Sequence, residues 1–169
     1  MKNLLLSAFM LLSLVTMGQE NFKLNLSSQI PDAEQTTMVT SQLQDRLYDL
    51  IAHYHDVQQA HWNVKGPQFE SLHGLLGEFY GSLATDIDRL AERKLALGKA
   101  ADGRPSAVAT SSKVGSSTTG FQMDYNVVKD LVKSTKTLSD NLGDSIKATG
   151  NADIVSQDLL IGIKANIDH

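Results

Sequence analysis

The sequence predicts an all-α protein: a four-helix bundle in which a long crossover connection joins the second helix to the third. Three observations lead to this prediction. Apolar residues recur at spacings of three or four along four separate segments, which is the pattern of an amphipathic helix. A stretch rich in Gly, Ser and Thr separates the second segment from the third, whereas the other connections are short. The chain of 169 residues, 41% of them hydrophobic, is long enough for one globular domain.

The first two helices are the most regular part of the pattern. The inward face of the first is expected to consist of Leu43, Leu47, Leu50, Tyr54, Val57 and His61. A Lys-Gly-Pro break at residues 65–67 ends this helix. The second helix ends near Gly98, and its inward face is expected to consist of Phe69, Leu72, Leu76, Phe79, Leu83, Ile87, Leu90 and Lys94. The short connection predicts an antiparallel pair.

Residues 101–122 break the helical pattern and include SSKVGSSTTG, so we expect a connector without helix. Gly150 follows the third helix, which is marked by Val128, Leu131, Thr135, Leu138, Leu142 and Ile146. The fourth begins near Asn151, an acceptable N-cap, and its apolar face consists of Val155, Leu159, Ile163 and Ile167. Short, long and short connections in this order suggest the arrangement of ferritin-like folds. The last helix reaches His169 without a stop signal, which leaves open whether the C-terminus is natural or truncated.

Residues 1–18 have the order of a secretory signal peptide: Lys2, an apolar run over residues 4–15, and then the small residues Thr16 and Gly18 before a cleavage point. The run is shorter than the ~20 apolar residues that a membrane-spanning helix needs. We therefore expect export to the periplasm or the exterior and no membrane span. The alternatives are an uncleaved N-terminal helix packed on the domain and a cytoplasmic protein.

Residues 19–40 are polar and without periodicity, so we expect a flexible tail ahead of a domain at residues 41–169. The tail carries three acidic residues and Lys23, a net charge of −2, and the whole chain carries −4 with no run of basic residues. DNA binding is therefore not expected, because a phosphate backbone repels such a surface. The absence of cysteine excludes disulfides, thiolate zinc sites and cysteine nucleophiles.

Two histidines flank the break between the first two helices. A neutral imidazole is a good ligand for a divalent metal, so His61 and His73 are candidate ligands. The alternative is that each is a hydrogen-bonded core residue, which is the commoner role of a lone histidine on an apolar face. Asp88 and Glu92, four residues apart on one helical face, add two carboxylates, unless they belong to a solvated ion-pair surface.

Helix geometry sets a condition on a joint site. Asp88 follows His73 by fifteen residues on one helix, which is ~22 Å, so the two cannot share a metal within one chain. Two copies of this helix that cross antiparallel about a two-fold axis near Tyr80 would bring His73 of one to Asp88 and Glu92 of the other. Close approach would be allowed by the small residues Gly74, Gly77, Gly81 and Ala84, which otherwise mark a poorly packed exposed helix.

The stretch AHWNVKGPQFESLHGLLGEFY, followed by DRLAER and ALG, resembles the Dps family of mini-ferritins, the DNA-binding proteins from starved cells. The resemblance runs from about Leu43 to the C-terminus. It implies a hollow homododecamer in which Fe²⁺ is oxidised, usually by hydrogen peroxide, at sites shared by two-fold-related subunits. By position it makes His61 and His73 iron ligands from one subunit, and Asp88 and Glu92 ligands from its partner.

The resemblance also implies roles for two further residues. Trp62 matches a tryptophan near the metal centre that takes up oxidising equivalents, with core packing as the alternative. Asp153 matches a position near a three-fold pore for iron entry, but many helices simply begin with an aspartate that the helix dipole favours.

One ligand of the family pattern is missing. The family has an aspartate one turn after the second histidine, where this chain has Gly77, and the neighbouring Glu78 points about 100° away. We therefore expect one good iron site per chain at each interface, with His61, Asp88 and Glu92, and a weaker second one. An intrasubunit centre built on Glu70 and His73 is not expected, because a second Glu-x-x-His copy is missing.

The predicted function is that of a ferroxidase, weakened by Gly77, which stores ferric iron in a shell and protects against oxidative damage. Hydrogen peroxide is the expected oxidant, with oxygen as the alternative. Two other functions stay open. One is a noncatalytic cage, structural or DNA-compacting, in which Gly77 has abolished useful iron oxidation. The other is an exported helical interaction module.

Overall fold

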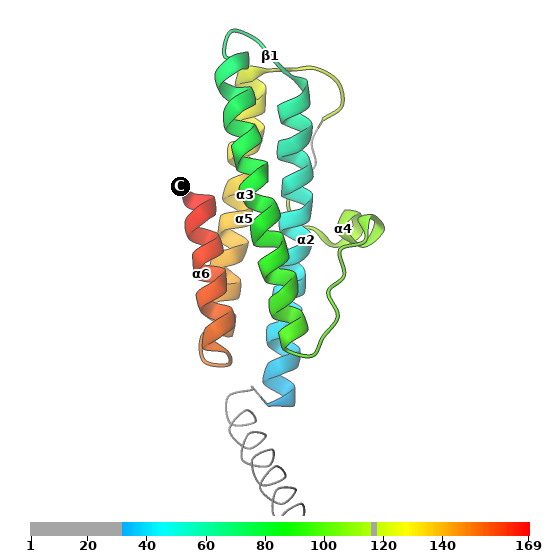
Figure 1. Cartoon of the computed structure of the whole chain (residues 1–169), viewed down its shortest axis with the longest axis vertical. Helices are drawn as coiled ribbons and strands as arrows, with labels where there is room; N and C mark the ends of the chain where they lie inside the picture. The colour runs from blue at the N-terminus through cyan, green and yellow to red at the C-terminus, as the bar shows by residue number, and fades with distance from the viewer. Residues whose placement is uncertain (1–31, 116–117) are drawn as a thin grey trace, which may run out of the picture.

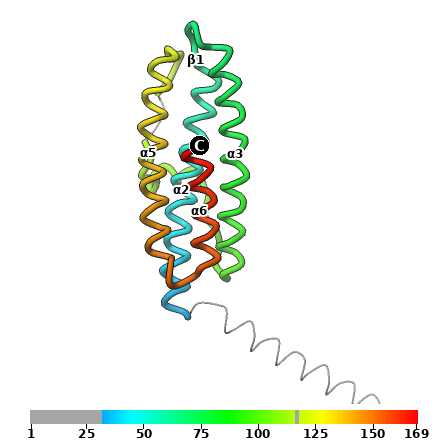
Figure 2. Tube along the Cα trace, turned by 90° about the vertical axis from the view of Figure 1, so that its left-hand side faces the viewer, coloured from blue at the N-terminus to red at the C-terminus, as the bar shows by residue number. Residues whose placement is uncertain are grey.

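The computed structural model describes residues 32–115 and 118–169, so the predicted signal peptide and most of the predicted tail lie outside the described residues. The long helices are α2 (Ala33–Asn63), α3 (Phe69–Ala96), α5 (Asp124–Thr149) and α6 (Ile154–Asp168). They run side by side as a bundle (Figure 1, Figure 2), which confirms the predicted all-α architecture. In the described ranges, no helix combines the length and the apolarity that crossing a membrane requires.

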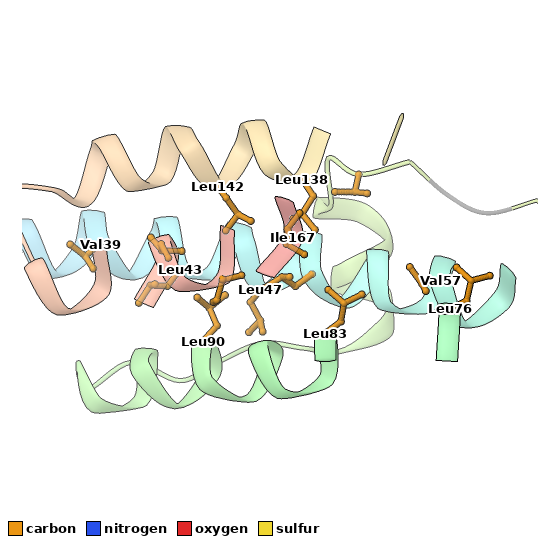
Figure 3. Packing of buried hydrophobic residues seen from close by; sticks show 14 of the residues in the cluster. Val39, Leu43, Leu47, Val57, Leu76, Leu83, Leu90, Leu138, Leu142 and Ile167 are labelled. Carbon is orange, nitrogen blue, oxygen red and sulfur yellow. The ribbon is translucent and has the colours of Figure 1, made fainter. Parts of the chain in front are cut away.

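A core of leucine, isoleucine and valine side chains holds the bundle together. Helix α2 lies at its centre and packs against both α3 and α5, and α5 packs against α6. Figure 3 shows side chains from all four helices meeting between the ribbons, among them Leu43, Leu83, Leu90, Leu138 and Leu142, which are fully buried. The predicted inward faces of the first two helices therefore point toward the core, except at Phe69, which is 43% exposed.

The predicted faces of the last two helices are wrong at one position each. Val128 is 44% exposed, and its neighbour Val127 is buried instead. Both valines lie three or four residues before Leu131, so their spacing could not decide between them. Val155 is 56% exposed, because the first turn of α6 turns its neighbour Ser156 inward, where that side chain is fully buried.

Helix α2 begins eight residues before the predicted domain boundary, so the prediction of a tail up to residue 40 is wrong. Asp32 Oδ1 accepts a hydrogen bond from the Gln35 backbone N–H at 2.8 Å, and Gln35 Oε1 accepts one from the Asp32 N–H at 3.3 Å. This reciprocal pair is a capping box, which satisfies two backbone donors at the start of a helix. The added turns bury Val39 completely.

The other helix ends differ less from prediction. Gly98, with φ +75°, follows α3 as expected, because this left-handed conformation suits glycine. The N-cap of α6 is Asp153, not Asn151, and its Oδ1 accepts a hydrogen bond from the Val155 N–H at 3.2 Å.

The prediction of a connector without helix over residues 101–122 is wrong at residues 105–111. A short helix, α4 (Pro105–Ser111), starts at a proline and is too brief to show periodicity. The two-residue strands β1 (Val64–Lys65) and β2 (Gln122–Met123) pair in parallel. The connector thus lies outside α2 and returns to the end of the bundle at which β1 lies (Figure 1).

A buried carboxylate fastens this connector to the bundle. Asp49 Oδ1 accepts hydrogen bonds from the Lys113 backbone N–H at 2.7 Å and from Ser112 Oγ at 3.2 Å. Its Oδ2 accepts one from Asn141 Nδ2 at 3.0 Å and pairs with Arg46 Nη2 at 3.0 Å. Both members of this ion pair are buried, so α2, α5 and the connector share one polar network.

Candidate metal centre

The histidines at positions 61 and 73 meet face to face at the end of the bundle. His61 lies in the last turn of α2 and His73 near the start of α3, and their rings stack with centroids 3.7 Å apart and planes at 20°. The reversal between the helices needs Gly66, which has φ +128°. A β-carbon at Gly66 would also lie 2.6 Å from Asp124 Oδ2. The sequence placed the two histidines on neighbouring helices, and the fold puts them in contact.

Each imidazole is held by the backbone of the other residue. His61 Nδ1 donates to the His73 carbonyl oxygen at 2.7 Å, and His73 Nδ1 donates to the His61 carbonyl oxygen at 2.9 Å. A carbonyl oxygen can only accept, so both Nδ1 atoms carry a proton. In the neutral ring, Nε2 then holds the lone pair that a metal takes. The two hydrogen bonds therefore fix the orientation of both rings, and each ring presents its Nε2 atom as a ligand for a metal.

Two aromatic side chains and a glycine complete the surroundings of the histidine pair. The ring of Tyr80 stands edge-on to His61 at a centroid distance of 5.3 Å, and Phe69 stacks on His73 at 5.1 Å. A β-carbon built on Gly77 would lie 3.4 Å from His61 Cε1, an ordinary van der Waals distance. A side chain at position 77 would therefore point at this imidazole, but glycine supplies no donor atom there.

The carboxylates of Asp88 and Glu92 lie elsewhere in the same chain. Both are exposed, and α3 is one unbroken helix between them and His73, so ~22 Å of helix separates Asp88 from that ring. In the part of the chain that the structure describes, no three His, Asp or Glu side chains gather to hold a metal. At 100° per residue, positions 73, 77, 88 and 92 nevertheless fall on one stripe of α3.

This chain is similar in sequence to known proteins. The ferritin-like domain family matches residues 40–169. The chain is 30% identical over 118 residues to DNA protection during starvation protein 2 of Deinococcus radiodurans, covering 70% of this chain but only 49% of that protein. It is 35% identical over 128 residues to general stress protein 20U of Bacillus subtilis, covering 68% of this chain and 79% of that protein. The chain belongs to the Dps family of ferritin-like proteins.

Solved Dps structures agree with the fold. The structure of Dps from Microbacterium arborescens superposes with a TM-score of 0.77 at 29% identity, covering 82% of this chain and 91% of that one. Crystal structures of Dps proteins from Deinococcus radiodurans and Staphylococcus aureus superpose over much of the chain as well. The predicted ferritin-like bundle is thereby confirmed.

The two residues to which the resemblance gave special roles lie in contrasting surroundings. Trp62 is 60% exposed, so its alternative role in core packing is wrong. Asp153 is buried, and its Oδ2 pairs with Arg93 Nη2 at 2.6 Å and accepts from Ser156 Oγ at 2.6 Å. Burial acts to raise the pKa of Asp153, but the hydrogen bonds from Ser156 and Arg93 outweigh it and lower that pKa. This geometry favours the helix-capping role of Asp153, and its pore role stays a prediction.

Sequence reasoning missed a buried histidine in the core of this Dps-family bundle. His53 is fully buried, with Nε2 3.1 Å from Thr135 Oγ1 and its ring edge-on to Phe79 at 5.6 Å. Burial lowers the pKa of His53 to about 4, so the ring is neutral at physiological pH. Its spacing of three from Leu50 and four to Val57 was the signal that could have found it.

Proposed function

We propose that this Dps-family protein is a mini-ferritin, which oxidises Fe²⁺ at sites shared by two subunits and stores the ferric product in a hollow homododecameric shell. The reciprocal hydrogen bonds of His61 and His73 carry this proposal, because they orient two imidazoles with Nε2 as the donor atom. The similar Microbacterium arborescens protein was solved in a high iron form, which supports iron as the metal. Hydrogen peroxide is the proposed oxidant.

The outer side of α3 supports a shared site. A β-carbon on Gly74 or Gly81 would have no atom within 4 Å, so this part of the helix is open to a partner. An antiparallel crossing of two α3 helices near Tyr80 would place the histidine pair of one subunit opposite Asp88 and Glu92 of the other, and the reverse. Imidazole and carboxylate together are donors that suit Fe²⁺.

Gly77 sets the proposed stoichiometry of this site. The position faces His61 but offers no oxygen atom, so the shared centre has one carboxylate fewer than the family pattern. One iron position keeps His61, Asp88 and Glu92, and the other loses a charged ligand and binds more weakly. A noncatalytic cage is the second candidate function, and Gly77 is the observation that favours it.

Charge and the N-terminal pattern support two further parts of the proposal. The chain carries −4 overall, so we propose that the shell acts without binding DNA. Export beyond the cytoplasmic membrane is proposed from the signal pattern of residues 1–18. A shift of linear DNA in a gel at low salt would contradict the first of these proposals.

The test is anaerobic Fe²⁺ titration followed by hydrogen peroxide, with the parent protein and a His61→Ala, Glu92→Ala double variant. The parent is expected to bind and oxidise iron rapidly, and the double variant only at the background rate. A His169→Ala, Asp144→Ala variant removes the same two kinds of group from exposed positions and should behave as the parent. Equal, slow oxidation in all three proteins would refute the ferroxidase function and favour the noncatalytic cage.

A further inference from the structure

Two tyrosines, Tyr80 of α3 and Tyr54 of α2, lie next to the histidine pair between these two helices. The ring of Tyr80 stands edge-on to His61 at 5.3 Å, and the ring of Tyr54 stands edge-on to Tyr80 at 5.8 Å with planes at 86°. Both distances are typical of aromatic side chains in direct contact. Both phenol rings are partly buried and pack against the core, and Tyr54 Oη accepts a hydrogen bond from Gln58 Nε2 at 3.1 Å. A continuous chain of rings thus connects His61 with the interior.

The number of electrons needed to reduce hydrogen peroxide indicates a role for these aromatic rings. Cleavage of the O–O bond of hydrogen peroxide to two water-level oxygens takes two electrons, but one Fe²⁺ ion supplies one. Because Gly77 leaves only one firm iron position in the proposed centre, a second Fe²⁺ is not held ready beside the first. Without another donor, the second oxygen would leave as a hydroxyl radical, which damages the protein.

We propose that Tyr80 supplies the second electron and that Tyr54 shares the resulting oxidised state; this inference rests on the proposed function. The step balances as Fe²⁺ + H₂O₂ + TyrOH → Fe³⁺ + OH⁻ + H₂O + TyrO•. The O–O bond breaks, iron gives one electron, and the phenol gives one electron and its proton, which ends in water. A second Fe²⁺ and a proton then return TyrO• to TyrOH, so that one peroxide oxidises two iron ions in sequence.

The geometry points to Tyr80 and not to Trp62, the residue that the family resemblance suggests. Within the described part of the chain, the aromatic rings in contact with His61 are those of His73 and Tyr80. The side chain of Trp62 is 60% exposed in the single subunit, so it lies largely outside the packing around His61. Oxidised Tyr80 is partly shielded and has Tyr54 in ring contact as a second place for the unpaired electron.

The test is electron paramagnetic resonance of samples frozen shortly after peroxide is added to the Fe²⁺-loaded protein. The parent is expected to show a tyrosyl radical whose spectrum narrows when ring-deuterated tyrosine is incorporated. Tyr80→Phe should lose this signal, release more hydroxyl radical to a spin trap and still bind Fe²⁺. Tyr54→Phe should shorten the lifetime of the radical. Each change removes only a hydroxyl group, so the packing of the rings is retained.

Tyr125 is the matched control, because it is exposed and lies at the start of α5, and Tyr125→Phe should leave signal and radical release unchanged. A signal that persists in Tyr80→Phe, or that disappears only in Trp62→Phe, would overturn the proposed electron donation by Tyr80. So would rapid iron oxidation without a tyrosyl radical, an outcome that leaves the ferroxidase function standing. Failure of the parent to oxidise iron would instead overturn the ferroxidase function, and with it the proposed electron donation by Tyr80.

Discussion

The neutral histidine in the core makes the stability of this protein sensitive to mild acid. His53 is fully buried against Phe79 and Thr135, and its Nδ1 has no hydrogen-bond partner within the described residues. Burial lowers the pKa of the folded-state imidazole to about 4, whereas the same ring in the unfolded chain titrates near the model-peptide value of about 6.5. Between these two values the unfolded chain binds one more proton than the folded one.

The sign and size of the effect follow from proton linkage. The contribution of His53 is fully present above pH ~6.5 and is lost progressively as the pH falls toward the folded-state pKa of about 4. Each pH unit in this window costs ~1.4 kcal/mol, so the complete loss is on the order of 3 kcal/mol. That is a large fraction of the ~5–15 kcal/mol by which a domain is typically stable.

The assay is urea unfolding at constant subunit concentration between pH 7 and pH 4.5, with the parent and a His53→Met variant. Constant concentration is needed because subunit association adds to the apparent stability. The difference in unfolding free energy between the two proteins should change by ~1.4 kcal/mol per pH unit below pH ~6.5. Carboxyl groups titrate equally in both, so they cancel. A difference that stays constant with pH would show that His53 is not buried and neutral.

Three further substitutions test single contacts. Gly77→Asp fits without a clash, since the new β-carbon would lie 3.4 Å from His61 Cε1. It should raise the number of tight Fe²⁺ sites found by anaerobic titration from one per chain to two. An unchanged number of sites would contradict the role given to position 77. Asp49→Ala leaves the buried Arg46 without its carboxylate partner and should lower the free energy of unfolding by ~3–5 kcal/mol. An unfolding free energy equal to that of the parent within error would refute the role of Asp49 in fastening the connector. Asp32→Ala removes the capping box and should cost ~1 kcal/mol in urea unfolding; full retention would place the true helix start later.

The helices and the identity of the candidate ligands could be predicted because both are local properties of the chain. A helical period of 3.6 residues places Leu43, Leu47 and Leu50 on one side whatever packs against them. The same period shows that His73 and Asp88 cannot meet within one helix. Errors arose where two neighbouring residues satisfied the spacing equally, as with Val127 and Val128, because only a partner surface distinguishes them.

By itself, the sequence determined the all-α class and the crossover between the second and third helices, and it predicted that a metal site built from His73 and Asp88 needs a partner chain. Only the tertiary structure decided that the rings of His61 and His73 stack, that position 77 faces His61, and that Tyr80 touches the same ring. These contacts join residues of different helices. They depend on how each helix is rotated and shifted against its neighbour, which the packing of the whole core sets and no spacing within one segment encodes.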